Sequence, residues 1–200
     1  SVNGKQEIMD QVFPLIKKYG GVVVGLTIDE SGIPDTAEGR LEVAQKIIKE
    51  AAKYGIDKKD IVIDVLAMTI SSDPDSARIT LDAVKLVREK CGVRTVLGVS
   101  NISFGLPYRP AVNSNFYTMA MQNGLSVGII NPGSEDMMKA WYAFHALMAL
   151  DSNCEKYIAR YAQQPGTTPV QAAGGKHTMT LQSAIERGLK EEASSITAEL

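Results

Sequence analysis

The sequence has few of the residues that build metal centres, disulfides and nucleic-acid interfaces. It holds two cysteines, Cys91 and Cys154, and two histidines, His145 and His177, none of them at the spacing of a zinc site. We therefore expect buried free thiols, no metal site and a cytoplasmic protein, because reducing compartments keep thiols free. The net charge is only -2 and there is no basic block, which argues against nucleic acid as a partner.

Long apolar runs and phosphate-binding loops are also missing. No stretch approaches the roughly 20 apolar residues that span a bilayer, so we expect no membrane partner. No charged-then-apolar leader opens the chain, which predicts no signal peptide. The patterns GxGxxG, GxxxxGK[ST] and GxSxG do not occur after any predicted strand, so nucleotide binding and serine hydrolase chemistry have no support.

What the sequence does hold is an alternation of strand and helix patterns. Runs rich in Val and Ile predict buried parallel strands at 22–28, 61–66, 95–99 and 126–130. Amphipathic stretches predict helices at 8–18, 35–55, 73–92, 113–123, 134–150 and 154–162. The repeat has the size of one unit of an eight-fold β/α barrel. The fold class is therefore α/β, as either an open doubly wound sheet or half of a barrel.

The last part of the chain changes in character. Residues 163–179 are rich in Gly, Pro, Thr and Gln, which predicts a linker. Residues 180–200 return to a helical pattern with an apolar stripe that one isolated helix cannot bury. This segment is either a helix that docks on the preceding domain, residues 1–162, or the first helix of another domain.

Polar residues stand where the predicted strands end, and ligands of parallel α/β folds bind at that edge. Asp64 lies within the apolar run IVIDVLAM and needs a partner, either an internal Lys or Arg or a ligand that presents N–H donors. Asn101 follows the third strand and is either a ligand residue or a turn residue. Arg109, between two prolines, is either a binding residue in a stiffened loop or a solvated surface arginine.

The stretch GVSNISFGLPYRPAVNSNFYTMAMQNGLSVGIINP, residues 98–132, resembles the pterin-binding domain of cobalamin-dependent methionine synthases. It is also similar to the methyltetrahydrofolate:corrinoid/iron–sulfur protein methyltransferases. The likeness extends through LTIDESGIPDTAEGRLEVAQKII and DIVIDVLAMTIS and covers most of residues 1–162. It implies the C-terminal half of a pterin-binding (β/α)8 TIM-type barrel, beginning at the end of the family's fourth strand. Residues 180–200 resemble the start of a cobalamin-domain helical cap.

The resemblance also implies roles for individual residues. Asp64 matches the aspartate that accepts hydrogen bonds from the pterin amino and ring N–H groups, and Asn101 matches the asparagine at the methyl-bearing nitrogen. Arg109 matches a loop arginine near the pterin, and Phe104 stands where it could pack on the ring. The substrate implied is 5-methyltetrahydrofolate. Asn101 is then the catalytic residue, and the cobalamin is carried by another module, since the DxHxxG motif for its lower ligand is absent.

Three functional interpretations follow from the resemblance. The first is a methyltransferase fragment or subunit that positions 5-methyltetrahydrofolate for methyl transfer to cob(I)alamin in methionine synthesis. It would need a missing N-terminal half-barrel or a homodimer partner, together with a cobalamin-binding module. The second is a non-catalytic half-barrel that serves folate binding or assembly. The third is a methyltetrahydrofolate:corrinoid/iron–sulfur protein methyltransferase, against which the cap-like tail argues.

Overall fold

The computed structural model describes residues 1–162 and residue 197. It divides into two compact units, Ser1–Met148 and Ala149–Leu200, and the predicted linker and terminal helix lie outside the described residues. The first unit carries the sheet and most of the helices. In the second unit, a 3-10 turn η3 (Ser152–Cys154) leads into the short helix α6 (Glu155–Tyr161). No described helix is long and apolar enough to cross a membrane.

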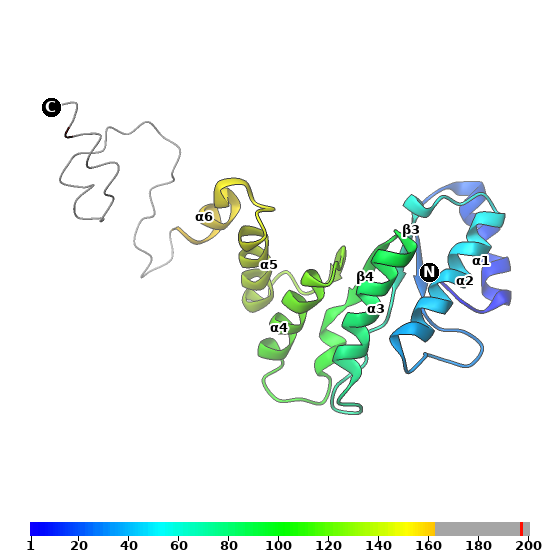
Figure 1. Ribbon diagram of the computed structural model, residues 1–200, viewed down its shortest axis with the longest axis horizontal. Helices are drawn as coiled ribbons and strands as arrows, with labels where there is room; N and C mark the ends of the chain where they lie inside the picture. Colours follow the sequence, from blue (N-terminus) through cyan, green and yellow to red (C-terminus); the bar gives the residue numbers. More distant parts are fainter. Residues whose placement is uncertain (163–196, 198–200) are drawn as a thin grey trace. The chain divides into compact units, whose positions relative to one another are not determined.

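The first unit is built on one sheet of five parallel strands in the order β1-β2-β3-β4-β5 (Figure 1). The strands are β1 (Val2–Asn3), β2 (Val23–Leu26), β3 (Ile61–Asp64), β4 (Arg94–Gly98) and β5 (Val127–Ile129). Each neighbouring pair is parallel. The predicted parallel α/β architecture is therefore confirmed, and β1 lies at the position where the resemblance implies the end of a strand.

In the first unit, four helices connect successive strands and a fifth follows the last strand. They are α1 (Gln6–Tyr19), α2 (Ala37–Lys53), α3 (Ser76–Cys91), α4 (Arg109–Gln122) and α5 (Glu135–Leu147), with 3-10 turns η1 (Lys58–Asp60) and η2 (Val99–Ser103). The Thr36 hydroxyl caps α2 by accepting from the Gly39 N–H at 3.1 Å. The start of α4 was predicted four residues too late, and Arg109 is its first residue rather than part of a loop. The reason is that Pro110 suits a first helical turn, where no backbone donor is needed.

One face of the sheet packs against the helices. Ile63 and Leu97 are fully buried on it. At Gly25 an added Cβ would lie 3.1 Å from Ile47 of α2, and at Gly128 it would lie 2.8 Å from the Tyr117 ring of α4. The two glycines occur where a helix approaches the strands closely, so the core lies between this face and the helical layer.

The opposite face of the sheet has no helical cover in the described residues. Strand registers place Asp64 beside Val96 and Gly98 beside Ile129, with side chains on this second face. Val127 is 45% exposed and Ile129 is 61% exposed. In a closed β/α barrel this face is filled by side chains of the other strands. The first unit therefore has the form of a section of barrel wall, as the half-barrel prediction requires.

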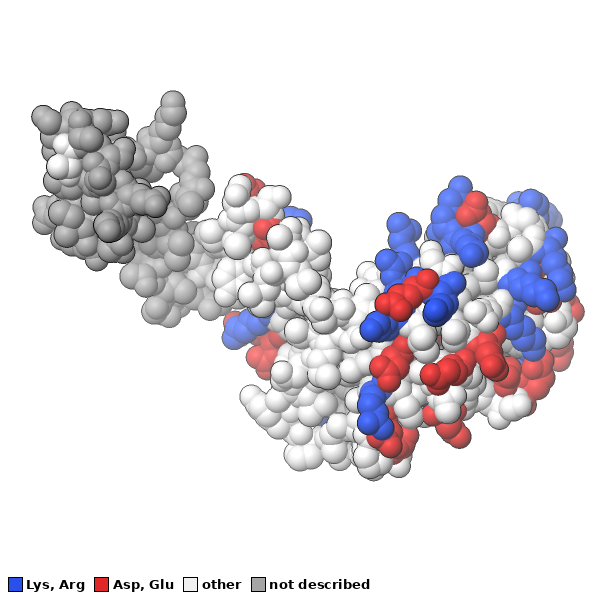
Figure 2. Space-filling view, in the orientation of Figure 1, with Lys and Arg blue, Asp and Glu red and all other residues white. Residues whose placement is uncertain are grey.

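Charged side chains gather over the outer helices α1 to α3, and few occur over α4 (Figure 2). The sequence explains this distribution, because Arg109 is the only charged residue between Arg94 and Glu135. The loops that follow β4 and β5 therefore carry no charged residue, and Arg109, at the start of α4, is the one charge near them.

Candidate functional site

The loops that follow β3 and β4 are joined by hydrogen bonds at the carboxyl edge of the sheet. The hydroxyls of Thr69 and Ser71 donate to the Phe104 carbonyl oxygen at 2.6 and 2.7 Å. The Ile70 N–H donates to the Ile102 carbonyl oxygen at 3.0 Å. These bonds fix the β3 loop, which follows Asp64, against the β4 loop, which contains Asn101 and Phe104. The connected loops thus link the end of β3, which carries Asp64, to the segment that holds Asn101 and Phe104.

Asp64 ends β3 and is half-buried on the uncovered face of the sheet. Its Oδ1 accepts one hydrogen bond, from the Leu66 N–H at 2.9 Å. The ion pairs among the described residues all lie elsewhere, so Asp64 has no internal Lys or Arg partner. Burial raises the pKa of Asp64 above its usual value, and the Leu66 N–H opposes that rise in part. The carboxylate is therefore desolvated without a counter-charge, which leaves it available to a ligand with N–H donors.

Asn101 lies in η2, immediately after β4, and is exposed. Its Nδ2 is 3.0 Å from the point that a Cβ at Gly98 would occupy, so the amide lies over that glycine. Gly98 shares the uncovered face with Asp64. Among the described residues the Asn101 amide has no hydrogen-bond partner, although its main-chain oxygen accepts from the Phe104 N–H at 3.3 Å. The side chain therefore does not serve the turn and remains free to contact a ligand.

Arg109 contacts the turn that carries Asn101. Its Nε donates to the Ser103 hydroxyl at 2.9 Å and its Nη2 to the Ser100 carbonyl oxygen at 2.7 Å. Its guanidinium carbon also lies 4.5 Å from the centroid of the Phe104 ring, a cation–π contact. Arg109 is thus not a solvated surface arginine. It holds η2 in place, and Phe104, 51% exposed, is held by the same guanidinium.

Arg40 is a residue of the site region that sequence reasoning missed. It lies on α2, is 3% exposed, and bonds to the chain directly after Asp64: its Nη1 donates to the carbonyl oxygens of Val65 and Leu66 at 3.0 and 2.8 Å. A signal was present in the sequence, since Arg40 interrupts the apolar stripe of α2 one turn after Ala37. A cation at such a position predicts a buried, hydrogen-bonded arginine.

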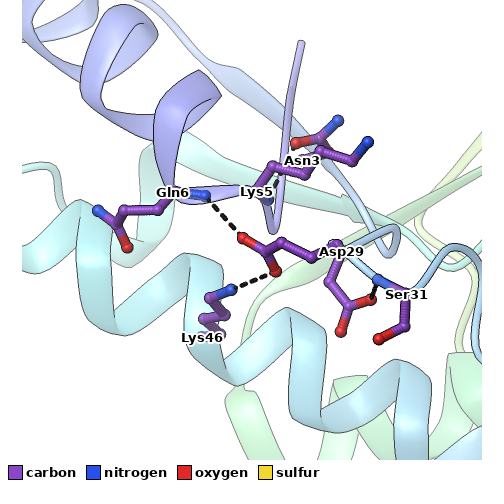
Figure 3. Close-up of polar contacts among 7 residues, drawn as sticks. Asn3, Lys5, Gln6, Asp29, Ser31 and Lys46 are labelled. Carbon is purple, nitrogen blue, oxygen red and sulfur yellow. Dashed lines mark hydrogen bonds and ion pairs between the residues drawn. The ribbon is translucent and has the colours of Figure 1, made fainter.

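The carboxylates that follow β2 have structural partners (Figure 3). Glu30 accepts from the Gln6 N–H at 3.1 Å and from the Lys46 ammonium at 3.0 Å. These two bonds link the start of α1 to α2. The Lys46 bond, helped by main-chain N–H groups, lowers the pKa of Glu30 to about 2. Asp29 accepts from the Ser31 N–H at 2.8 Å. Within the described residues no group of three or more His, Cys, Asp or Glu side chains could hold a metal ion.

Comparison with known proteins adds a family match. A family model described as "Pterin binding enzyme" matches residues 1–131. A methylcorrinoid:tetrahydrofolate methyltransferase of Eubacterium limosum is 35% identical over 86% of this chain and 64% of its own length. The methionine synthases of Mycobacterium leprae and Mycobacterium tuberculosis are 35% and 33% identical over 64% of this chain. The chain spans only 11% and 12% of those two synthases.

Proposed function

The chain belongs to the pterin-binding enzyme family, and from that premise we propose that it binds a tetrahydrofolate for methyl exchange with a corrinoid. The relatives named above are methyltransferases. The observation that carries the proposal is the half-buried Asp64 carboxylate, which has no counter-charge among the described residues and lies on the uncovered face of the sheet. A pterin edge supplies the N–H donors that this carboxylate lacks.

Asp64 is the residue proposed to bind the pterin. A carboxylate accepts two parallel hydrogen bonds from an amino group and an adjacent ring N–H, and both bonds are charge-assisted. Partial desolvation strengthens them, because fewer water molecules compete for the carboxylate oxygens. The Leu66 N–H bond to Oδ1 leaves Oδ2 without a partner among the described residues. The Leu66 bond therefore orients the carboxylate and leaves Oδ2 able to accept hydrogen bonds from a ligand.

Asn101 is the proposed catalytic residue. As a methyl group leaves a tertiary amine, the N–C bond breaks and its electron pair stays on the nitrogen, which takes a proton. An amide placed beside that nitrogen stabilises the protonated form and orients the ring, although it is not itself an acid. The free side chain of Asn101, over Gly98, suits this role. Phe104 and Arg109 are proposed to complete the pocket, Phe104 by packing on the ring and Arg109 by holding η2.

The corrinoid is proposed to come from another module or protein. When bound, it supplies the cobalt that accepts or donates the methyl group. The one histidine among the described residues, His145, has its Nδ1 2.8 Å from the Trp141 carbonyl oxygen and its ring 4.0 Å from that of Trp141. The sequence also lacks the DxHxxG motif. The described residues therefore do not fit a lower-ligand site, and their role is to bind and position the folate.

The direction of transfer has two candidates. Methionine synthases suggest transfer from 5-methyltetrahydrofolate to cob(I)alamin, as part of methionine synthesis. The match to the methylcorrinoid:tetrahydrofolate methyltransferase covers 86% of the chain against 64% for the synthases, and this wider match favours transfer to tetrahydrofolate. The same Asp64 and Asn101 serve both directions, because forward and reverse reactions share a transition state. Methylcobalamin mixed with tetrahydrofolate, or cob(I)alamin mixed with 5-methyltetrahydrofolate, distinguishes them by the product formed.

The uncovered face of the sheet favours a further strand-bearing element as a partner. Exposed Val127 and Ile129 lie on this face, and we propose that a second half-barrel, from the same polypeptide or from a second copy, covers it. The non-catalytic alternative, a folate-binding or assembly module, predicts pterin binding without methyl transfer in either direction.

Calorimetric titration of tetrahydrofolate into the chain tests the proposed function. We expect saturable binding, and we expect Asp64→Asn to weaken it while far-ultraviolet circular dichroism shows an intact fold. A wild-type chain that does not bind tetrahydrofolate, or an Asp64→Asn variant of equal affinity, overturns the proposal.

A further inference from the structure

Arg40 is the most completely buried charged side chain near the site, and the proposed function leaves it without a role. It is 3% exposed and lies on the core-facing side of α2. Four acceptors lie within hydrogen-bond distance of it: the two N–H groups of Nη1 are shared among the Val65 and Leu66 carbonyl oxygens and the Thr80 hydroxyl, and Nε donates to the Pro34 carbonyl oxygen at 3.0 Å. A buried guanidinium is tolerated only when its N–H groups are hydrogen-bonded in this way.

The acceptors of Arg40 place it at the turn that orients Asp64. Val65 and Leu66 directly follow Asp64, and Leu66 has a φ of 65°, in the left-handed region that a residue with a Cβ rarely adopts. That conformation points the Leu66 N–H back to Asp64 Oδ1, at 2.9 Å. Thr80 supports the same turn, since its hydroxyl lies 3.3 Å from the Leu66 carbonyl oxygen. A strained turn of this kind persists only when surrounding contacts hold it.

We propose that Arg40 is a positioning residue for Asp64: by binding the Val65 and Leu66 carbonyls it holds the left-handed turn that aims the carboxylate at the pterin. The inference rests on the proposed function for the identity of the ligand, but its structural part stands on the hydrogen bonds of Arg40 alone. Arg40 acts through the main chain, because it donates to the Val65 and Leu66 carbonyl oxygens, whereas the Asp64 carboxylate accepts from the Leu66 N–H.

The charges around this turn allow a specific readout. Burial lowers the pKa of Arg40, and the carboxylates of Asp35 and Asp73 oppose that lowering. Burial raises the pKa of Asp64, and the Leu66 N–H lowers it. Loss of the Leu66 bond therefore raises the pKa of Asp64 further, whereas a general loosening of the fold admits water and lowers it.

Arg40→Lys tests the structural part, because lysine keeps the charge but cannot donate to all four acceptors. The matched control is Arg88→Lys, since Arg88 also donates to a main-chain oxygen, that of Val93 at 3.0 Å, where β4 begins. We expect faster hydrogen exchange at the Leu66 amide and a higher pKa of Asp64, followed by carbon NMR of its carboxyl group, in Arg40→Lys only. Unchanged Leu66 exchange and an unchanged Asp64 titration in a folded Arg40→Lys variant overturn the proposal.

A second measurement links the turn to the ligand. We expect Arg40→Lys to weaken tetrahydrofolate binding about tenfold, the scale of losing a residue that orients a ligand-binding side chain. Glycine adopts the left-handed conformation without strain, so Leu66→Gly in the Arg40→Lys background should restore part of that affinity. Failure of the rescue in a folded double variant overturns the positioning role. If the wild-type chain does not bind tetrahydrofolate, the proposed function fails, and the exchange and titration experiments still decide the inference.

Discussion

Replacing Asp64 by asparagine is expected to change ligand affinity and fold stability in opposite directions. The substitution keeps the size of the side chain and an Oδ1 acceptor for the Leu66 N–H, but it removes the charge and puts an NH2 group in place of Oδ2. A pterin edge that presents N–H donors then meets a donor instead of an acceptor. Hydrogen bonds to a charged group contribute about 1.5–3 kcal/mol each. We therefore expect tetrahydrofolate affinity to fall roughly 10- to 150-fold.

The same substitution should stabilise the fold near neutral pH. Burial raises the pKa of Asp64 in the folded chain above its ordinary value of 3.8. Because the folded-state pKa lies above the unfolded one, folding favours the protonated form of this carboxyl. The free energy of unfolding therefore falls as pH rises from 3.8 through the folded pKa. Asparagine carries no such penalty. Its advantage is therefore present at pH 7 and absent below 3.8, where Asp64 is protonated in both states.

Two measurements test these expectations for affinity and stability. Calorimetry at pH 7 gives the affinity for tetrahydrofolate, and thermal unfolding at pH 7 and at about pH 3 gives the change in stability. Asp82→Asn, at an exposed position of α3, is the control for removing a carboxylate far from the turn. An Asp64→Asn variant that binds as wild type does, or that melts at a lower temperature than wild type at pH 7, would refute the reasoning.

Three further outcomes are expected. Asn101→Ala should lower the single-turnover methyl-transfer rate roughly 10²–10³-fold, about 2.7–4 kcal/mol, with a smaller loss of substrate affinity; equal losses would make Asn101 only a binding residue. Removal of the residues after Gln163, which include the cap-like segment 180–200, should leave tetrahydrofolate affinity unchanged in the same calorimetric assay. Because the pKa of Glu30 is lowered to about 2, its bond to Lys46 stabilises the fold above about pH 4.5 and is lost as pH falls toward 2; Glu30→Gln should remove this pH dependence of thermal unfolding without changing affinity.

Much of the fold could be predicted from local patterns along the chain. Apolar runs indicated strands, and four of the five strands lie within or beside those runs, although one face of the sheet has no helical cover in the described residues. The Thr36 cap of α2 is a contact of the same local kind, since it joins residues only three positions apart. The same locality explains the error at Arg109. Tyr108 adopts a φ of 46° before α4, and a bulky residue gives no local sign of that conformation.

The sequence by itself determined that Asp64 lies within one strand and that Asn101 follows the next, which places both toward the same edge of a parallel sheet. Only the tertiary structure decided what those side chains contact. Asp64 needs a partner, either an internal Lys or Arg or a ligand with N–H donors. Whether a Lys or Arg reaches it depends on packing between distant segments. Arg40 is separated from Val65 by 25 residues along the chain, yet it binds the turn after Asp64 and forms no ion pair with Asp64 itself. Hydrophobic periodicity depends on residues that are close in sequence. The partner of a buried charge depends on which elements pack together when the chain folds.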